Sequence, residues 1–494
     1  MTRARRALAA ALLIAVGALS GCASSVPVRQ GAGPTLPPPR EEFPAPVGDA
    51  AEGFAQTVLV ALVSVQTGQL AMFPERILLS PGRHPAEFAL RRLFSFAPTT
   101  QALPVAPEGT LALSPGSAVE VSGDTATVNL GPGALSLSAA QRATAFRAIA
   151  ATLTQWGDIR YVNVLISGRQ PGLDTASTLP TGSFTGGLED SAAGDAAAAR
   201  AAGAGRGLLA EGRTVTFPSA SIPDMAAALM GALSAGALTL PGLPRVPDLA
   251  TLLAGPPEVE ENPGGGGRVV RLRFHESAND ALITARIPRS VMMASLAYTL
   301  TTFLPYVGGV AVQIGSERIT AVVPSGTYEG AGDEILFQGG VMARSQFSHF
   351  LLSPCALYFA DGTGALRASY RAIPWFQAYN PRFLLGQLMA GPMNTDSVPG
   401  LMPTLPAGLT DADLLGVSRA GDAVLVNFSQ RLRELARGQD GAAERRMVYS
   451  AVNTLTSRRG VTRVFFFIGG SRDGVFSEAI DVAGQFLRAE GLVQ

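Results

Sequence analysis

The sequence predicts an α+β protein in which one small unit occurs three times, with the element order β-β-α-β-β-α-β and one face of each sheet covered by two helices. The main observation is the tripeptide Thr-Leu-Thr, which begins at Thr152, Thr299 and Thr454 and each time ends an apolar-periodic helix that precedes a strand. Intervals of 147 and 155 residues are too long for one unit of a solenoid. The recurrence therefore indicates three similar domains in tandem.

The three Thr-Leu-Thr helices have the same apolar face. Counting back by four and by seven residues from the central leucines, Leu153, Leu300 and Leu455, gives apolar or small residues each time, which is the spacing of a core-facing helix. Strands are predicted downstream, because every second residue is apolar in three sets: Val162/Val164/Ile166, Val310/Val312/Ile314 and Val464/Phe466/Ile468. We expect the leucines to occupy equivalent core positions and the threonines beside them to tolerate Ser or Ala.

A second helix is predicted earlier in each unit, ending at a small residue followed by Pro98, Pro256 or Pro392. In the first and third units it begins at Pro85 and Pro381, since proline is well tolerated in the first helical turn. Two strands in hairpin order precede it in those units, at 58–64 and 69–79, and at 356–360 and 365–375.

Between the two helices of the first and third units lies a strand that contains the pair Val-Asn, at Asn129 and Asn427. In the middle unit the corresponding strand, 269–274, has no asparagine, and residues 225–233 read as an extra apolar helix.

Together these features resemble the GerMN domain of sporulation and germination lipoproteins. The resemblance rests on the helix closing on Ala-Gly-Pro, the Val-Asn strand after an acidic or Gly turn, and the Thr-Leu-Thr helix before a strand and Gly. It is good at 54–172 and 354–478, and degenerate at 207–320, for which an unrelated insertion with chance similarity is the alternative. The resemblance implies a fold similar to the ring-building modules of secretion systems.

The N-terminus predicts a lipoprotein signal peptide over residues 1–22. A basic start with Arg3, Arg5 and Arg6 precedes an apolar core at 7–19, and Leu-Ser-Gly-Cys then resembles a bacterial lipobox ending at Cys22. The apolar core is too short to span a membrane. We expect cleavage before Cys22 and lipidation of its thiol, with an ordinary secretory signal as the alternative.

The segments between the units are predicted to be connectors. Residues 23–53 are a Pro/Gly-rich tether and 173–206 an Ala/Gly-rich linker, while 321–353 join the middle and third units and 479–494 form a C-terminal tail. The glycine-rich stretch 258–267 is interpreted as a surface loop of the middle unit.

Charge and composition exclude several function classes. The 38 basic and 38 acidic residues give zero formal charge, so neither nucleic acid nor a polybasic membrane patch is indicated. All basic residues other than the three histidines are arginine. A Walker-A phosphate loop, a Schiff-base lysine and a pyridoxal-phosphate site each need the lysine that this chain lacks.

No common catalytic arrangement is visible, and we expect no catalytic, cofactor-binding or metal-binding residues. The histidines His84, His275 and His349 lack metal-binding spacing and are interpreted as solvated or locally hydrogen-bonded. With Cys22 committed to lipid, Cys355 is alone and is interpreted as a small buried hydrophobe.

The predicted function is a non-catalytic, membrane-anchored envelope scaffold on the extracytoplasmic face. The resemblance implies a role in assembling the channel complex between mother cell and forespore, with envelope or sporulation-channel proteins as partners, and it is compatible with oligomers. The alternative is an envelope lipoprotein of a non-sporulating bacterium that binds cell-wall components, or that modulates a sensor kinase or a wall hydrolase.

Overall fold

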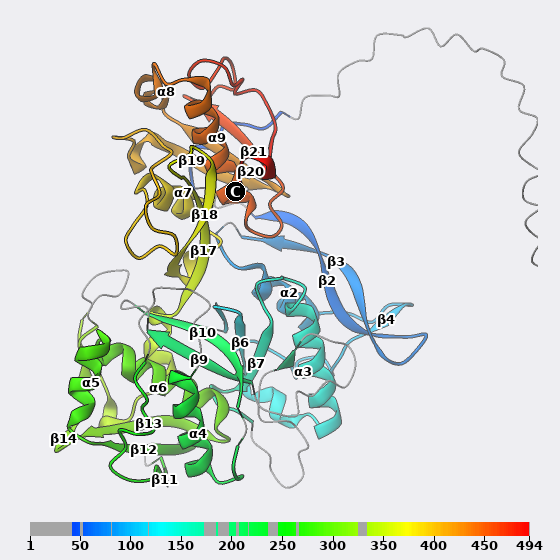
Figure 1. Cartoon of the computed structure of the whole chain (residues 1–494). Helices are drawn as coiled ribbons and strands as arrows, with labels where there is room; N and C mark the ends of the chain where they lie inside the picture. Colours follow the sequence, from blue (N-terminus) through cyan, green and yellow to red (C-terminus); the bar gives the residue numbers. More distant parts are fainter. Residues whose placement is uncertain are drawn as a thin grey trace, which may run out of the picture. The chain divides into compact units, whose positions relative to one another are not determined.

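The computed structural model describes residues 42–49, 53–80, 82–116, 118–171, 184–185, 197–203, 207–215, 217–235, 246–262, 266–324 and 333–493 (Figure 1). The chain divides into two units, residues 1–44 and 45–494, and the elements below all belong to the second. Cys22 and most of the predicted tether lie outside the described residues. None of the described helices is both long and apolar enough to cross a membrane.

The first repeat begins with a long antiparallel hairpin and continues with a sheet in the order β5-β6-β7-β8, in which β6 and β7 are parallel. Its α-helices cover one face. Its elements are β2 (Phe54–Ser64), β3 (Leu70–Leu79), α2 (Pro85–Phe94), β4 (Ala102–Leu103), β5 (Val119–Ser122), β6 (Thr125–Leu130), α3 (Ala139–Leu153), β7 (Tyr161–Ile166) and β8 (Phe184–Thr185).

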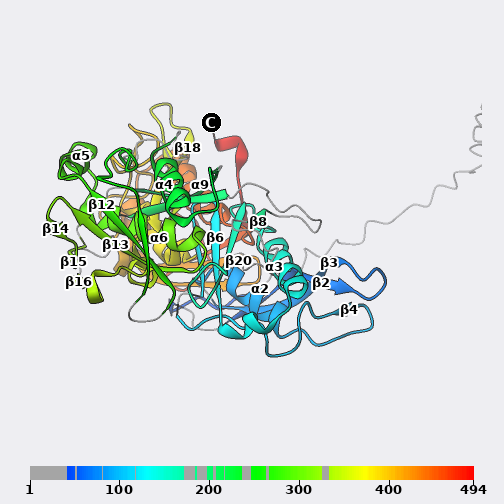
Figure 2. The same ribbon diagram turned by 90° about the horizontal axis from the view of Figure 1, so that it is seen from below.

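The middle repeat has the same order of hairpin, helix, two strands, helix and strand, with β12 parallel to β13. Its elements are β9 (Ala197–Gly203), β10 (Leu208–Thr214), α4 (Ile222–Ser234), β11 (Glu258–Glu261), β12 (Arg268–Phe274), α5 (Ser277–Ala285), α6 (Arg289–Phe303), β13 (Val307–Ile314) and β14 (Glu317–Arg318). Figures 1 and 2 show α4 and α6 next to β12 and β13.

The third repeat follows a short connection made of β15 (Ala321–Val322), β16 (Ile335–Leu336) and the 3-10 helix Arg344–Phe350. Its elements are β17 (Leu352–Ala360), β18 (Leu366–Pro374), α7 (Pro381–Met389), β19 (Leu414–Ala420), β20 (Ala423–Phe428), α8 (Arg431–Ala436), α9 (Gly441–Thr456), β21 (Arg463–Ile468) and β22 (Phe486–Leu487).

One strand from the start of the chain joins the sheet of the third repeat. β1 (Gly48–Asp49) pairs in parallel with β19. The Nδ2 of Asn427 donates a hydrogen bond to the backbone oxygen of Pro46, 3.0 Å away. The close approach needs Gly416, since a Cβ there would lie 2.3 Å from the Pro46 oxygen.

The three sheets share one register. Val128 pairs with Val164, Val270 with Val310 and Val426 with Phe466 in the parallel ladder of each repeat. The side chains of Leu153, Leu300 and Leu455 are buried in all three. The middle segment therefore has the topology of the other two repeats.

The asparagine of the Val-Asn strand holds the turn after the last helix-covered strand. Asn129 Oδ1 accepts a hydrogen bond from the N–H of Gly168 at 2.7 Å, and Asn427 Oδ1 accepts one from Gly470 at 3.0 Å. In the middle repeat, Arg273 stands at this position of the ladder. The asparagine of the motif thus stabilises a turn in the first and third repeats.

Several sequence-based expectations differ from the structure. The residues before Pro256 form turns instead of a helix end, and the first helix of the middle repeat is α4, which contains the supposedly extra helix 225–233. The predicted linker 173–206 contains β9, paired along its length with β10. Ala- and Gly-rich residues have low strand propensity, so this strand depends on its pairing partner and is not visible in the composition.

The predicted connector 321–353 is also structured. It contributes Phe337, Phe347 and Phe350 to the core of the middle repeat. The predicted C-terminal tail likewise contains β22, which pairs with β21. These segments complete the sheets and cores of the repeats, so they are parts of the folded body.

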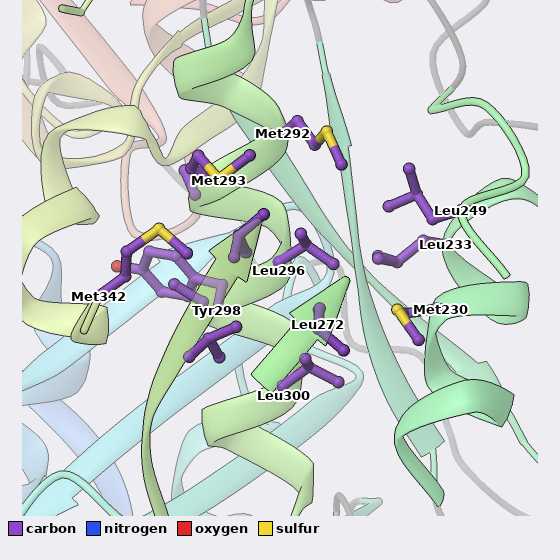
Figure 3. Close-up of a cluster of buried hydrophobic side chains, with 14 of the residues drawn as sticks. Met230, Leu233, Leu249, Leu272, Met292, Met293, Leu296, Tyr298, Leu300 and Met342 are labelled. Atoms are coloured by element: carbon purple, nitrogen blue, oxygen red, sulfur yellow. The ribbon is translucent and has the colours of Figure 1, made fainter. Parts of the chain in front are cut away.

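Helix α6 is buried on every side, from Ser290 to Phe303. Figure 3 shows its side chains between Met230 and Leu233 of α4 on one side and Met342 on the other. A helix that is apolar all round is expected to be enclosed by protein on all faces. Here the first repeat supplies part of that enclosure, because Tyr298 of α6 reaches Glu120 of β5.

Candidate functional site

The three repeats meet at Ser122, the last residue of β5. Its hydroxyl donates a hydrogen bond to the backbone oxygen of Leu352 in the third repeat and accepts one from the N–H of Ala210 in the middle repeat, at 3.1 Å. The hydroxyl of Ser353 donates to the Val121 oxygen at 2.9 Å. One buried serine is therefore bonded to both of the other repeats.

Glycine makes this close packing possible. Gly123 has φ +57, and a Cβ on it would lie 1.9 Å from the backbone oxygen of Ala210. A Cβ on Gly207 would lie 2.4 Å from the oxygen of Phe350. Larger residues at these positions would push the backbones apart.

A buried ion pair connects the first repeat to the connector after the middle one. Arg344 Nη2 donates to Glu120 Oε2 at 2.6 Å, and the hydroxyl of Tyr298 donates to Glu120 Oε1 at 3.1 Å. The guanidinium lies 4.1 Å from the centre of the Tyr298 ring. Burial, reinforced by the nearby carboxylate, raises the pKa of Tyr298 well above its usual value, so the hydroxyl stays a donor.

A second buried polar cluster joins the first and third repeats. The hydroxyl of Tyr379 donates to Asp158 Oδ2 at 3.0 Å, and the Tyr379 ring packs edge-on against His84, with 4.4 Å between ring centres. His84 also begins α2, because its Nδ1 accepts a hydrogen bond from the Ala86 N–H at 3.0 Å. Hence the proton of the neutral ring is on Nε2, which lies 4.0 Å from Asp158 Oδ2.

His84 is the one histidine that is not solvated. Burial lowers its pKa to about 4, with a smaller lowering from Arg458, against the opposing effect of Asp158. His275 and His349 are exposed. The interpretation of the histidines as solvated or locally bonded groups thus applies to His84 only in its local bond to Ala86.

Cys355 lies in β17 and is fully buried, next to the guanidinium of Arg458. Burial raises the pKa of its thiol to about 11, although Arg458 partly opposes this. The thiol is therefore protonated at neutral pH and is a poor nucleophile. Arg458 also donates to the backbone oxygen of Pro354 at 3.0 Å.

A polar cleft of about 450 Å³ lies between the outer face of the first sheet and the middle repeat. It is lined from the first repeat by Thr127, Asn129, Ser167 and Arg169, from the middle repeat by Gly266 and Gly308, and from the connector by Arg344 and Ser345. Glu120 lies at its inner end. Its volume is that of a small-molecule site.

In the described part of the chain, no three His, Cys, Asp or Glu side chains come together in a way that could hold a metal ion. Both buried clusters were missed by sequence reasoning. The bonded partners Glu120 and Arg344 are 224 residues apart and Asp158 and Tyr379 are 221 apart, and neither Glu120 nor Asp158 belongs to a recognisable motif.

Comparison with known proteins gives one family match. Residues 356–474 match the Germane family, described as "Sporulation and spore germination". No curated protein matches the chain.

Solved structures give further likenesses. The tandem GerMN domains of the sporulation protein GerM from Bacillus subtilis are 15% identical, with 59% of this chain and 97% of that one covered and a TM-score of 0.23. The first GerMN domain of the same protein is 16% identical, covering 26% and 96%, with a TM-score of 0.22. A putative lipoprotein from Clostridium perfringens is 17% identical, covering 28% and 91%, with a TM-score of 0.17.

The family match coincides with the third repeat, from the middle of β17 to the turn after β21. It includes the Val-Asn strand and the last Thr-Leu-Thr helix, which carried the resemblance in the sequence. On this match the third repeat contains a Germane domain, and that part of the chain is similar to proteins of sporulation and spore germination.

Proposed function

We propose that this protein is a non-catalytic scaffold of a sporulation-related envelope complex, anchored to the membrane through lipid on Cys22 and exposed on the extracytoplasmic face. Three features support the proposal: the Germane match, the lipobox-like leader and the threefold repeat. The residue inventory supports a binding role, because it lacks the common catalytic arrangements.

The observation that carries the proposal is the way the repeats are joined. Ser122 is hydrogen-bonded to both other repeats, and the buried Glu120–Arg344 pair adds a charged contact. Removing one partner of such a buried pair costs several kcal/mol, so the pair opposes separation of the first repeat from the connector. A body of this kind presents its outer surfaces in a set arrangement, which is what an assembly component requires.

Repetition strengthens contacts without new chemistry. Several weak sites on one rigid body bind a multi-subunit partner with an effective concentration far above that of separate sites. We therefore propose other envelope or sporulation-channel proteins as partners, and oligomers of this chain within the same assembly.

The test is co-purification from membranes of the source bacterium, compared between the wild-type chain, Cys22→Ser and Glu120→Ala. We expect Cys22→Ser to leave the membrane fraction, and Glu120→Ala to stay on the membrane but lose envelope partners. In a spore-forming source, deletion of the gene should lower sporulation efficiency. A purified chain that turns over peptidoglycan, and loses that activity on changing one polar residue, would refute the scaffold proposal.

A further inference from the structure

The cleft between the first and middle repeats is suited to a small polar ligand. Its walls carry the hydroxyls of Thr127, Ser167 and Ser345 and the amide of Asn129, together with two arginines. A cleft lined by hydroxyls, an amide and cations suits a ligand that is itself rich in hydroxyls and carries negative charge.

Among the described residues that line the cleft, Arg169 carries a positive charge that has no carboxylate partner. Glu120 and Arg344 neutralise each other at 2.6 Å. Arg169 forms no salt bridge or side-chain hydrogen bond with the described residues. Its guanidinium is therefore available to pair with an oxyanion.

The middle repeat positions Arg169. A Cβ on Gly267 would lie 3.0 Å from Arg169 Cδ and 3.1 Å from Nη1, and one on Gly308 would lie 3.5 Å from Cδ. The arginine stem thus packs against the backbone of the middle repeat, and a side chain on Gly267 would crowd it.

Ser167 is held in an unfavourable conformation at the rim of the cleft. Its φ is +52, in the left-handed region, where a side chain is costly. The equivalent residues of the other repeats are glycines, Gly315 with φ +57 and Gly469 with φ +60. The middle and third repeats avoid this backbone strain with glycine, whereas the first repeat keeps a serine. Retained strain indicates that the Ser167 side chain has a function, and this side chain lines the cleft.

We propose that this cleft binds an oxyanion carried by a polyhydroxylated molecule, a sugar acid or a sugar phosphate. Arg169 pairs with the oxyanion, and Thr127, Asn129, Ser167 and Ser345 bond the hydroxyls. This site goes beyond the scaffold function and does not rest on it.

The test is isothermal titration calorimetry on the purified full-length chain with four probes: D-glucuronate, glucose 6-phosphate, inorganic phosphate and D-glucose. We expect saturable binding of glucuronate, glucose 6-phosphate or both, with glucose at least about tenfold weaker because it lacks the charge. Preference for glucuronate identifies a carboxylate source, and preference for glucose 6-phosphate a phosphate source. Equal binding of phosphate and glucose 6-phosphate would overturn the role of the hydroxyls.

Two variants and one control test whether Arg169 and Ser167 bind the ligand. Arg169→Gln should weaken binding at least about tenfold, while Arg160→Gln, which removes the same charge from an exposed position of the same repeat, should leave it unchanged. Ser167→Gly should fold at least as stably as the wild type and bind a few-fold more weakly. The proposal is overturned if no charged probe saturates below about 10 mM, if glucose binds equally well, or if Arg169→Gln binds like the wild type.

Discussion

The hydroxyl of Thr152 accepts a hydrogen bond from the backbone N–H of Ala61, 3.0 Å away, in the interior of the first repeat. Thr454 does the same for Tyr358 in the third repeat, at 3.1 Å. In these two repeats the first threonine of the motif thus ties the last helix to the opening hairpin. The last threonine has a local bond instead: Thr154 donates to the Ala150 oxygen one turn earlier.

We therefore predict that the two threonines respond differently to substitution, in contrast to the sequence-based expectation that both tolerate change. Thr152→Ala should lower the free energy of unfolding by about 1–3 kcal/mol, because the N–H of Ala61 loses its partner while buried. Thr152→Ser should retain most of the wild-type free energy of unfolding, and Thr154→Ala should change that free energy little. Urea unfolding measures all three, and equal losses for Thr152→Ala and Thr154→Ala would contradict the prediction.

The central leucines should each contribute strongly to stability. Leu153→Ala, Leu300→Ala and Leu455→Ala should each cost about 2–5 kcal/mol, the range for a large buried side chain that leaves a cavity. Exposed Leu135 supplies the control, since Leu135→Ala removes the same atoms from a surface position. Thermal and urea unfolding give the comparison, and an effect of Leu300→Ala no larger than the control would remove Leu300 from the set of equivalent core residues.

The Glu120–Arg344 pair should be far more sensitive than a surface pair. Glu120→Ala should cost about 3–5 kcal/mol, because it leaves the guanidinium of Arg344 buried without its carboxylate. Glu261→Ala, which breaks the exposed pair with Arg268, should cost at most about 1 kcal/mol. Chemical denaturation of both variants tests this, and similar losses would mean that the junction is solvated.

His84 should make the folded state less stable in mild acid. Its pKa falls from 6.5 to about 4 on folding, so below pH 6.5 the unfolded chain takes up a proton that the folded chain does not. The destabilisation of the folded state by His84 is absent above pH 6.5 and grows as the pH falls. Below pH 4 it levels off at roughly 3 kcal/mol of lost stability.

The matched variant is His84→Asn, which keeps a side chain able to cap α2 but cannot titrate. Unfolding free energies at several pH values between 4 and 7 should show a shallower fall for this variant than for the wild type. Parallel curves would show that His84 titrates normally in the folded protein.

Cys355 should be chemically silent until the protein unfolds. The thiol is buried and burial raises its pKa to about 11, so both access and thiolate content are low. A thiol reagent should label Cys355 slowly at neutral pH in the native protein and quickly in denaturant. The experiment uses the Cys22→Ser variant, in which Cys355 is the remaining cysteine. Fast labelling of native protein would show that the junction opens.

The periodic parts of the fold could be predicted from the sequence. Thr-Leu-Thr gave the position of α3, α6 and α9, and alternation gave β7, β13 and β21, because these elements each bury a regular face. Strand β9 was read as linker, since pairing with β10 rather than its own composition makes it a strand. Helix α6 has no charged residue from Ser290 to Phe303, and this did contain a signal, because a helix without a charged face is expected to be covered on all sides.

The polar junctions could not be predicted. Asp158 follows the Thr-Leu-Thr helix and Tyr379 precedes α7, and nothing in either neighbourhood specifies that they meet. Only the packing of whole repeats brings them together. Ser167 is the exception in principle, because the comparison of equivalent positions in three repeats shows serine where the others have glycine.

The pairing of β1 with β19 determines where a pull on the N-terminal segment is felt. β1 precedes β2 in the chain, so a force on the segment before β1 reaches the hydrogen bonds between β1 and β19 before it reaches the β2–β3 hairpin. The bond from Asn427 to Pro46 takes part of the same load. Tension therefore enters the Germane domain first, at the far end of the sequence, before it reaches the hairpin that follows β1 along the chain.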